Sequence, residues 1–361
     1  MNQRMRVPLL DLARLIAAAG VMIFHFGFHG GVTHRYLDAY QPSLGAWSRY
    51  GYLGVDVFFV ISGFVIAWSA RGASAASFAW RRWLRVYPTF LFCVAVTSTV
   101  IVLARDPHFQ ITWRQLLAHV IVDPRRFRLE FIDGAYWTIV CELQFYAFVA
   151  LGLAVPQLRK HATHCILAWF ALTLLNEYVL DLRMVRYAFV TQWSCFFMLG
   201  MAVFRLKTQG PAFTVAAFAV AAFAVGVHLE LRDAAVRFLI APDYSPFIVG
   251  AVLVSSIALL IFSMRFRFAQ RTEKVLQRLG SVSYPLYLLH GTIGYILINR
   301  LAPALGLPSA LLVASATLVA LASGVAFVVE PRLKAWCSDL RLRLAPRPQV
   351  EPAPQVDLAS R

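Results

Sequence analysis

The chain has 361 residues, of which 60% are hydrophobic and only 14% are charged. Soluble domains carry about 45–50% apolar and about 25% charged residues, so this composition excludes an ordinary water-soluble domain and a disordered chain. A net charge of +16 is compatible with nucleic-acid binding, but in a lipid-soluble chain it more often reflects positive cytoplasmic loops. We therefore predict an all-α integral membrane protein that binds membrane lipid and no nucleic acid.

Long apolar runs separated by short polar breaks predict a polytopic protein with about ten transmembrane helices. Each run is close to the ~17–25 residues that cross a hydrocarbon core of about 30 Å. The expected spans are Leu9–Phe28, Tyr52–Ala70, Tyr87–Ala104, Trp137–Val155, Cys165–Leu180, Ala188–Phe204, Ala212–Leu229, Pro246–Met264, Ser281–Ile298 and Ser309–Val329. Asp11 and Arg14 interrupt the first run, which favours a retained span over a cleaved signal peptide.

The distribution of Lys and Arg predicts the orientation of the chain. With the first residues in the cytoplasm, 21 Lys and Arg fall on inner segments and 12 on outer ones. We expect a multi-pass protein of the cell inner membrane with both termini cytoplasmic. The outer segments 29–51, 105–136 and 230–245 carry His, Arg, Asp and aromatic residues, which suit a polar ligand or an ordinary interfacial connection. We divide the chain into a transmembrane domain, 1–335, and a Pro-rich cytoplasmic tail, 336–361, expected to be disordered.

The five cysteines are scattered, without a CxxC motif or a Cys/His pair at metal spacing. This spacing favours neither a disulfide scaffold nor a metal site, so we expect no metal.

The first span carries ionisable residues, which are costly in a membrane and therefore candidates for function. Arg14 and His25 are eleven residues apart, which places them within roughly 20° of each other on a helix and roughly 16 Å apart along it. Asp11 lies on the same side. The alternative is a snorkelling arginine and a hydrogen-bonded core histidine.

The fourth span carries a polar ridge, because Thr138, Glu142 and Tyr146 are spaced i, i+4, i+8. A carboxylate in this position suits proton transfer, or it forms a structural ion pair with an arginine. The ninth span places Ser283, Tyr287 and His290 on one face in the same way.

The second span contains Asp56 and Ser62 together with three glycines. Gly51, Gly54 and Gly63 permit close approach of another helix, which is a packing role as readily as a functional one. After this span come Arg81, Arg82 and Arg85, whose clustered guanidinium groups bind phosphate strongly, set the topology or contact anionic lipid.

Together these motifs make the chain similar to the acyltransferase-3 family of integral membrane acyltransferases. The matching residues are Arg14 and His25, the block Gly54–Phe64, then Arg81, Arg82, Arg85 and Pro88, then Trp137, Thr138, Glu142, Phe145 and Tyr146, and finally Ser283, Tyr284, Leu286, Tyr287, Leu288 and His290. Thr138 replaces a commoner serine, and Leu143 replaces a frequent second carboxylate.

The resemblance implies an acyl-CoA donor, usually acetyl-CoA, supplied from the cytoplasm. It also implies a hydroxyl acceptor on a cell-surface carbohydrate or a lipid-linked sugar, although some relatives acylate antibiotics or other small molecules. His25 would be a general base or transient acyl acceptor, and Glu142 would orient it or stabilise its imidazolium. Arg14, Arg81, Arg82 and Arg85 would bind the donor, with Arg14 on the pyrophosphate or the thioester carbonyl. The expected supporting or substrate-binding residues are Asp11, Asp56, Ser62, Trp137, Thr138, Tyr146, Ser283, Tyr287 and His290.

Two other classes of function fit the same intramembrane charges. A secondary transporter or flippase would use them along a permeation path, but no internal repeat or pair of broken helices is evident in the sequence. A structural partner of a polysaccharide assembly complex is the third possibility.

Overall fold

The computed structural model describes residues 7–33, 36–210, 212–237, 244–263, 265–266 and 268–344. Within these ranges the chain is helical without a strand. Nine helical segments in the described ranges are long and apolar enough to cross a membrane. These findings confirm the prediction of an all-α polytopic membrane protein.

The helices follow one another with short connections. The first half contains α1 (Pro8–Phe24), the π-helix η1 (His25–Thr33), α2 (Pro42–Ser48), η2 (Arg49–Leu53), α3 (Gly54–Ala70), α4 (Ala75–Ala104), α5 (Trp113–Ala118), η3 (His119–Ile121), η4 (Pro124–Phe127), η5 (Gly134–Tyr136), α6 (Trp137–Ala154) and α7 (Pro156–Lys160). The second half contains α8 (Ala162–Leu175), η6 (Asn176–Leu180), α9 (Arg183–Phe189), α10 (Ser194–Gln209), α11 (Phe213–Arg237), α12 (Pro246–Ser263), α13 (Gln270–Leu289), α14 (Gly291–Leu305), α15 (Leu307–Gly324), η7 (Val325–Val329) and α16 (Glu330–Leu344).

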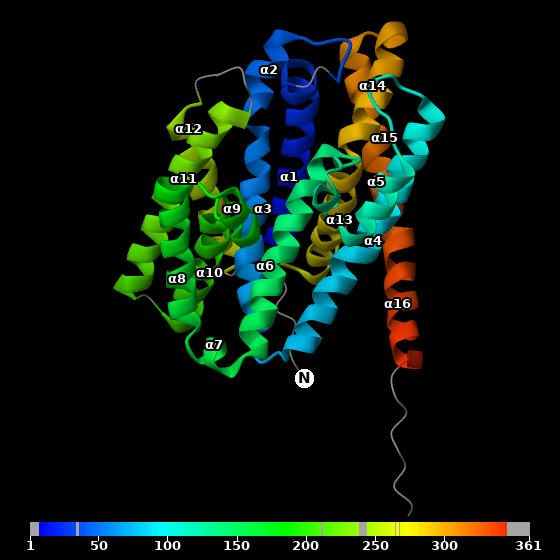
Figure 1. Cartoon of the computed structure of the whole chain (residues 1–361). Coiled ribbons are helices and arrows are strands. Elements are labelled where there is room, and N and C mark those ends of the chain that lie inside the picture. Colours follow the sequence, from blue (N-terminus) through cyan, green and yellow to red (C-terminus); the bar gives the residue numbers. More distant parts are fainter. Residues whose placement is uncertain are drawn as a thin grey trace, which may run out of the picture.

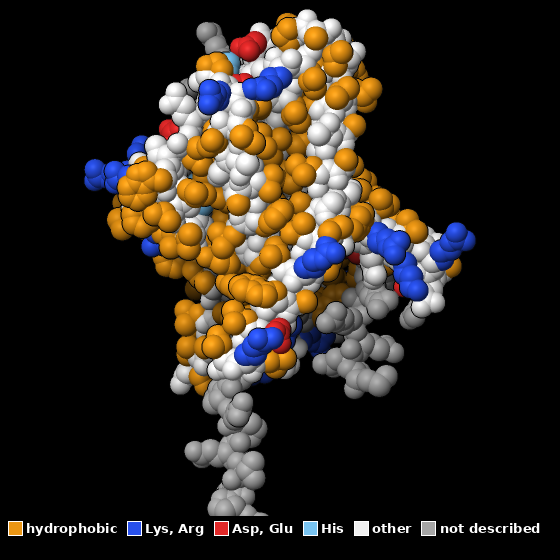
Figure 2. Space-filling view, turned by 90° about the vertical axis from the view of Figure 1, so that its right-hand side faces the viewer, with side chains coloured by type: hydrophobic (Ala, Val, Ile, Leu, Met, Phe, Trp, Pro, Cys, Tyr) orange, Lys and Arg blue, Asp and Glu red, His pale blue; other side chains and the backbone are white. Residues whose placement is uncertain are grey.

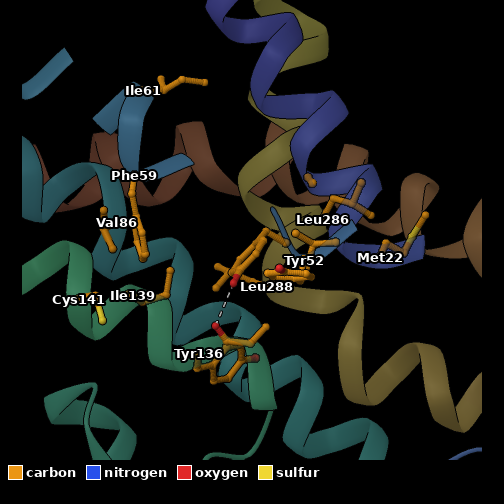
Figure 3. Packing of buried hydrophobic residues seen from close by; sticks show 14 of the residues in the cluster. Met22, Tyr52, Phe59, Ile61, Val86, Tyr136, Ile139, Cys141, Leu286 and Leu288 are labelled. Atoms are coloured by element: carbon orange, nitrogen blue, oxygen red, sulfur yellow. Dashed lines mark hydrogen bonds between the residues drawn. The ribbon is translucent and has the colours of Figure 1, made fainter. Parts of the chain in front are cut away.

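Figure 1 shows the long helices side by side, with α2 and α14 near the upper end of the view and α7 near the lower end. The main packing pairs are α3 with α10, α1 with α13, α10 with α11, and α14 with α15. The buried core lies where α1, α3, α4, α6 and α13 meet, and Figure 3 shows part of it, including Phe59, Val86, Ile139 and Leu286.

One side of the bundle is suited to face lipid. In α15 the buried residues Ala310, Ala314 and Leu318 recur every fourth position, whereas Leu312 and Val319 are exposed. One stripe of the helix is therefore buried against the bundle, and apolar side chains on its other faces point outward. The space-filling view of this side is mostly hydrophobic, with Lys and Arg at the top, at the left edge and in the lower half of the view (Figure 2).

The expected single span Ser281–Ile298 is wrong, because the helix is interrupted at His290 between α13 and α14. The Asp133 carboxylate satisfies the interrupted backbone: its Oδ2 accepts from the Thr292 amide at 2.7 Å, and its Oδ1 accepts from the Ala135 amide at 2.9 Å. Gly291 leaves room for this contact, since a Cβ there would lie 2.6 Å from both carboxylate oxygens. Asp133 therefore caps α14 from a distant segment of the chain.

The last helix, α16, runs to Leu344, so residues 336–344 of the expected tail are helical (Figure 1). Residues 345–361, the remainder of that tail, lie outside the described residues.

Glycine residues allow α3 to approach its neighbours closely. This agrees with the packing role, one of the two roles that the sequence suggested for these glycines. A Cβ on Gly63 would lie 2.0 Å from the Phe197 carbonyl oxygen, and one on Gly54 would lie 2.4 Å from the Ala17 carbonyl oxygen. Gly200 of α10 faces α3 in the same manner, because a Cβ on Gly200 would lie 2.0 Å from the Val60 carbonyl oxygen. The backbones of α3 and α10 are thus in direct contact, a packing that only residues without a side chain permit.

A buried carboxylate, Glu177, connects η6 with α9 and α11. Glu177 Oε2 accepts from Arg186 Nη2 at 2.8 Å and from Arg232 Nη2 at 2.7 Å. Thr191 donates to Glu177 Oε1 at 2.5 Å. The charges are therefore paired and hydrogen-bonded, as buried charges must be.

We expect Gly63→Ala to lower the melting temperature of the detergent-solubilised protein, because overpacking costs about 1–3 kcal/mol. Gly152→Ala is the matched control, since a Cβ there would meet nothing within 4 Å and helical Ala is favoured over Gly. Equal melting temperatures for the two variants would contradict the close contact of α3 with α10.

We expect Asp133→Asn to destabilise the protein by about 1–3 kcal/mol, because the amide group cannot accept from both Thr292 and Ala135. Thermal unfolding in detergent measures this loss. Asp38→Asn is the control, because the Asp38 side chain is 67% exposed and its pair with His108 contributes little. A melting temperature for Asp133→Asn as high as that of the control would exclude the capping role.

Candidate functional site

The structure gathers most of the predicted polar residues around two cavities. The smaller one, the arginine cavity, has a volume of about 70 Å³ and lies between α1, α3, α4, α6 and α13. Its polar lining consists of Arg14, Ser62, Arg82, Arg85, Thr138, Glu142, Tyr146, Tyr284 and Tyr287.

The arginines of this cavity come from two helices. Arg14 on α1 forms an ion pair with Asp11 (Nη1–Oδ1, 3.3 Å), as their spacing suggested. On α4, the i, i+3 spacing directs Arg82 and Arg85 to the cavity, and the Arg82 guanidinium carbon lies 6.0 Å from the centre of the Tyr146 ring. Arg81 points elsewhere and donates to the Ser77 hydroxyl and the Ser69 carbonyl. The structure therefore separates Arg81 from the other three.

Glu142 is held in the arginine cavity by the polar ridge of α6. Its Oε1 accepts from the hydroxyl of Tyr146, four residues on, and from Ser62 Oγ of α3 at 3.3 Å. His25 lines the other cavity, so the structure does not bring Glu142 to His25 as the resemblance implied. In this position the carboxylate instead balances the guanidinium groups that share its cavity.

The larger cavity, the histidine cavity, has a volume of about 690 Å³. It lies between η1, α3, α14 and the segment 105–136. Its lining includes His25, His29, Tyr36, Tyr52, Asp56, His108, Gln110, Gln115, Arg125, Glu130, Asp133, Trp137, Trp193, Tyr287, Thr292 and Tyr295. A cavity of this size, with aromatic faces and convergent polar groups, is typical of a ligand site.

His25 lies where α1 changes to the wider π-helix η1, a feature often found at functional sites. Its Nδ1 is 3.0 Å from the hydroxyl oxygen of Tyr295. The His25 ring also meets the edge of the His290 ring, with 4.7 Å between their centres, and lies 5.0 Å from the centre of the His29 ring. The structure thus places a buried imidazole in the wall of a large cavity, with a phenol as hydrogen-bond partner.

The two cavities have one wall in common, because Val55 and Tyr287 line both. Tyr287 Oη is 2.9 Å from Thr138 Oγ1 and donates to the Ala135 carbonyl at 3.2 Å. These bonds fix the phenol between α6 and α13. The arginine cavity and the histidine cavity therefore adjoin at Val55 and Tyr287.

Of the remaining predicted residues, Asp56 and Trp137 line the histidine cavity, whereas Ser283 and His290 are in neither lining. Asp56 is buried and lines the histidine cavity. In the same lining the rings of Trp137 and Trp193 lie against each other, tilted by 35° with 4.4 Å between their centres. The His290 ring, at the helix break, has Nδ1 2.7 Å from the Tyr287 carbonyl oxygen. Ser283 donates to the Gly280 carbonyl at 2.7 Å, a bond within its own helix, and lies outside both linings.

Sequence reasoning missed Asp133 and Tyr295, which the structure places beside the predicted residues. Asp133 directly precedes the helical turn η5, and an Asp in this position is a recognisable N-cap signal. The signal could have identified Asp133 as the cap of η5, but not as the cap of α14. Tyr295 had no signal of its own, because it is one aromatic residue in an apolar run.

A neutral histidine holds the segment 105–136 over the histidine cavity. His119 Nδ1 is 2.7 Å from the Gln115 carbonyl oxygen, and its Nε2 accepts from the Ile132 amide at 3.2 Å. Burial lowers the pKa of His119 below its usual 6.5, so the folded segment favours the neutral ring. Its contribution to stability is present above pH 6.5 and is lost as the pH falls below that value.

Among the described residues, no group of three His, Cys, Asp or Glu side chains is placed to hold a metal ion.

Curated proteins similar to the chain include acyltransferases. It is 27% identical over 184 residues to nodulation protein 10 of Rhizobium leguminosarum bv. viciae, covering 45% of this chain and 48% of that protein. It is 26% identical over 148 residues to acyltransferase MdmB of Streptomyces mycarofaciens, covering 39% of this chain and 38% of that protein. It is 26% identical over 175 residues to the O-acetyl transferase of Shigella phage Sf6, covering 42% and 46% respectively. The matches therefore span half or less of these relatives.

No solved structure matches the chain significantly. The model of the acyltransferase-3 family, described as an acyltransferase domain, matches residues 7–329. This match includes both cavities and the five motifs of the sequence, and the chain belongs to the acyltransferase-3 family.

Proposed function

We propose that the protein is an acyl-CoA-dependent O-acyltransferase. It transfers an acyl group, which we expect to be acetyl, to a hydroxyl of a cell-surface or lipid-linked carbohydrate. One observation carries the proposal: His25 and the arginines line adjoining cavities that share the wall formed by Val55 and Tyr287. Acyl transfer from CoA to an alcohol requires a base for the hydroxyl and a cationic site for the CoA phosphates. We assign these roles to the two sides of this wall.

The arginine cavity is the proposed donor site. CoA carries phosphates, and Arg82 and Arg85 offer charge-assisted donors for them. A cavity of about 70 Å³ is too small for the whole donor. We propose that the thioester end enters it while the phosphates stay at its mouth, where Arg85 is exposed. Arg14, which lines the same cavity from α1, is the proposed group that polarises the thioester carbonyl, and the Glu142 carboxylate balances part of the guanidinium charge.

The histidine cavity is the proposed acceptor site. Its volume of about 690 Å³ is ample for a sugar, and Trp137 and Trp193 offer the flat apolar faces on which sugar rings pack. We propose the inner membrane as the location, with the termini and the arginine cavity toward the cytoplasm, so that acyl-CoA and carbohydrate arrive from opposite sides.

In the proposed reaction, His25 takes the proton of the acceptor hydroxyl while the oxygen attacks the thioester carbonyl carbon. The carbon–sulfur bond then breaks, and the leaving thiolate takes the proton from the imidazolium. A positioned base contributes typically 10²–10⁴-fold to the rate. The arrangement requires no second nucleophile.

We expect Arg85→Ala to raise the KM for acetyl-CoA at least ~10-fold, because losing a charge-assisted hydrogen bond costs roughly 1.5–3 kcal/mol. Release of CoA from radiolabelled acetyl-CoA by purified protein measures this constant. Arg81→Ala removes a neighbouring charge outside the cavity and should leave the KM unchanged. Equal KM values for the two variants would mean that these arginines only set the orientation of the chain in the membrane.

We expect His25→Ala to lower turnover per folded molecule by ~10²-fold or more, with donor affinity nearly unchanged. The folded fraction is determined by size-exclusion chromatography. His228→Ala is the control, because His228 stacks on Tyr178 outside both cavities. If His25→Ala loses folded yield but retains full turnover per folded molecule, His25 is a packing residue and the mechanism is wrong.

A further inference from the structure

Tyr295 forms a hydrogen bond with His25. It lies on α14, five residues after the helix break, and its hydroxyl oxygen is 3.0 Å from His25 Nδ1. The two rings are nearly parallel, at 20°, with 6.0 Å between their centres. Both residues are buried, and both line the histidine cavity.

The Tyr295 ring is locked in place. It stacks on the Phe109 ring, with 3° between the ring planes and 6.1 Å between the ring centres. The centre of the Tyr36 ring lies 5.4 Å from the centre of the Tyr295 ring. The backbone of η1 closes the other side: a Cβ on Gly30 would lie 2.4 Å from Tyr295 Cε1. The phenol therefore has little freedom to turn away from His25, which is the condition for a preorganised partner.

We propose that Tyr295 is the positioning residue that sets the tautomer of His25; this inference rests on the proposed function. A neutral imidazole carries one N–H, and a neutral phenol either accepts or donates. When the Tyr295 oxygen accepts from Nδ1–H, the lone pair is on Nε2, and Nε2 takes the proton of the acceptor hydroxyl. When the phenol donates to Nδ1, Nε2 carries the hydrogen and cannot act as a base.

The same bond also acts during the proton transfer. Once Nε2 is protonated, the ring is a cation with two N–H donors, and the Tyr295 oxygen continues to accept from Nδ1–H. This is the task that a buried carboxylate performs in a catalytic triad, where it holds the tautomer and stabilises the imidazolium. The resemblance had assigned that task to Glu142, which lies in the arginine cavity and bonds to Ser62 and Tyr146. In this protein a phenol oxygen takes the place at Nδ1 that a carboxylate has in such a triad.

The test is Tyr295→Phe, which removes the hydroxyl and keeps the ring that packs on Phe109 and Tyr36. We expect kcat for transfer from radiolabelled acetyl-CoA to fall ~10-fold or more, with the KM for acetyl-CoA unchanged. We also expect the acidic limb of the pH–rate profile to move to lower pH, because the imidazolium loses an acceptor. Tyr178→Phe is the matched control: Tyr178 also lies beside a histidine, His228, but outside both cavities.

The outcomes separate the two claims. A wild-type protein that releases no CoA from acetyl-CoA contradicts the proposed function itself. An active wild type with the same kcat and pH profile in Tyr295→Phe overturns the role of Tyr295 alone. A loss of folded protein with normal turnover per folded molecule also overturns it, because it assigns Tyr295 to packing.

Discussion

The hydrogen bonds of Asp133 determine where the functional residues of the second half of the chain lie. This carboxylate caps α14 at the Thr292 amide and so permits α13 to end inside the bundle. In a bilayer an open helix end costs several kcal/mol for each unpaired group, so the break at His290 requires such a partner. On either side of this break, His290 meets the edge of His25 and Tyr295 reaches its Nδ1.

The second constraint is that charge inside a membrane needs a counter-charge or a cavity. Three guanidinium groups and the Glu142 carboxylate line the arginine cavity, whereas His25 lines the histidine cavity beside Tyr295. The histidine cavity has charged residues of both signs in its lining, namely Asp56, Arg125, Glu130 and Asp133. A wall formed by Val55 and Tyr287 keeps the two environments apart. We infer that this division keeps the three guanidinium groups of the arginine cavity, which suit phosphate, away from His25.

Much of this arrangement was predictable, and the exceptions share one cause. The i, i+4 spacing within a single helix correctly placed Glu142 beside Tyr146, and small residues correctly indicated the close approach of α3 to its neighbours. Spacing along one helix says nothing of distances between helices, so it could not show that Glu142 and His25 line different cavities. Hydropathy likewise missed the break at His290, because the cap comes from 159 residues away, and the partner of His25 is 270 residues away.

An experimental structure with a non-hydrolysable acetyl-CoA analogue tests most directly the claim that donor and acceptor occupy adjoining cavities. The account predicts that the phosphates lie against Arg82 and Arg85 and that the acyl end reaches the Val55–Tyr287 wall, toward His25. Density for the analogue inside the histidine cavity, with its phosphates beside His108 and Arg125, would contradict the assignment of both cavities.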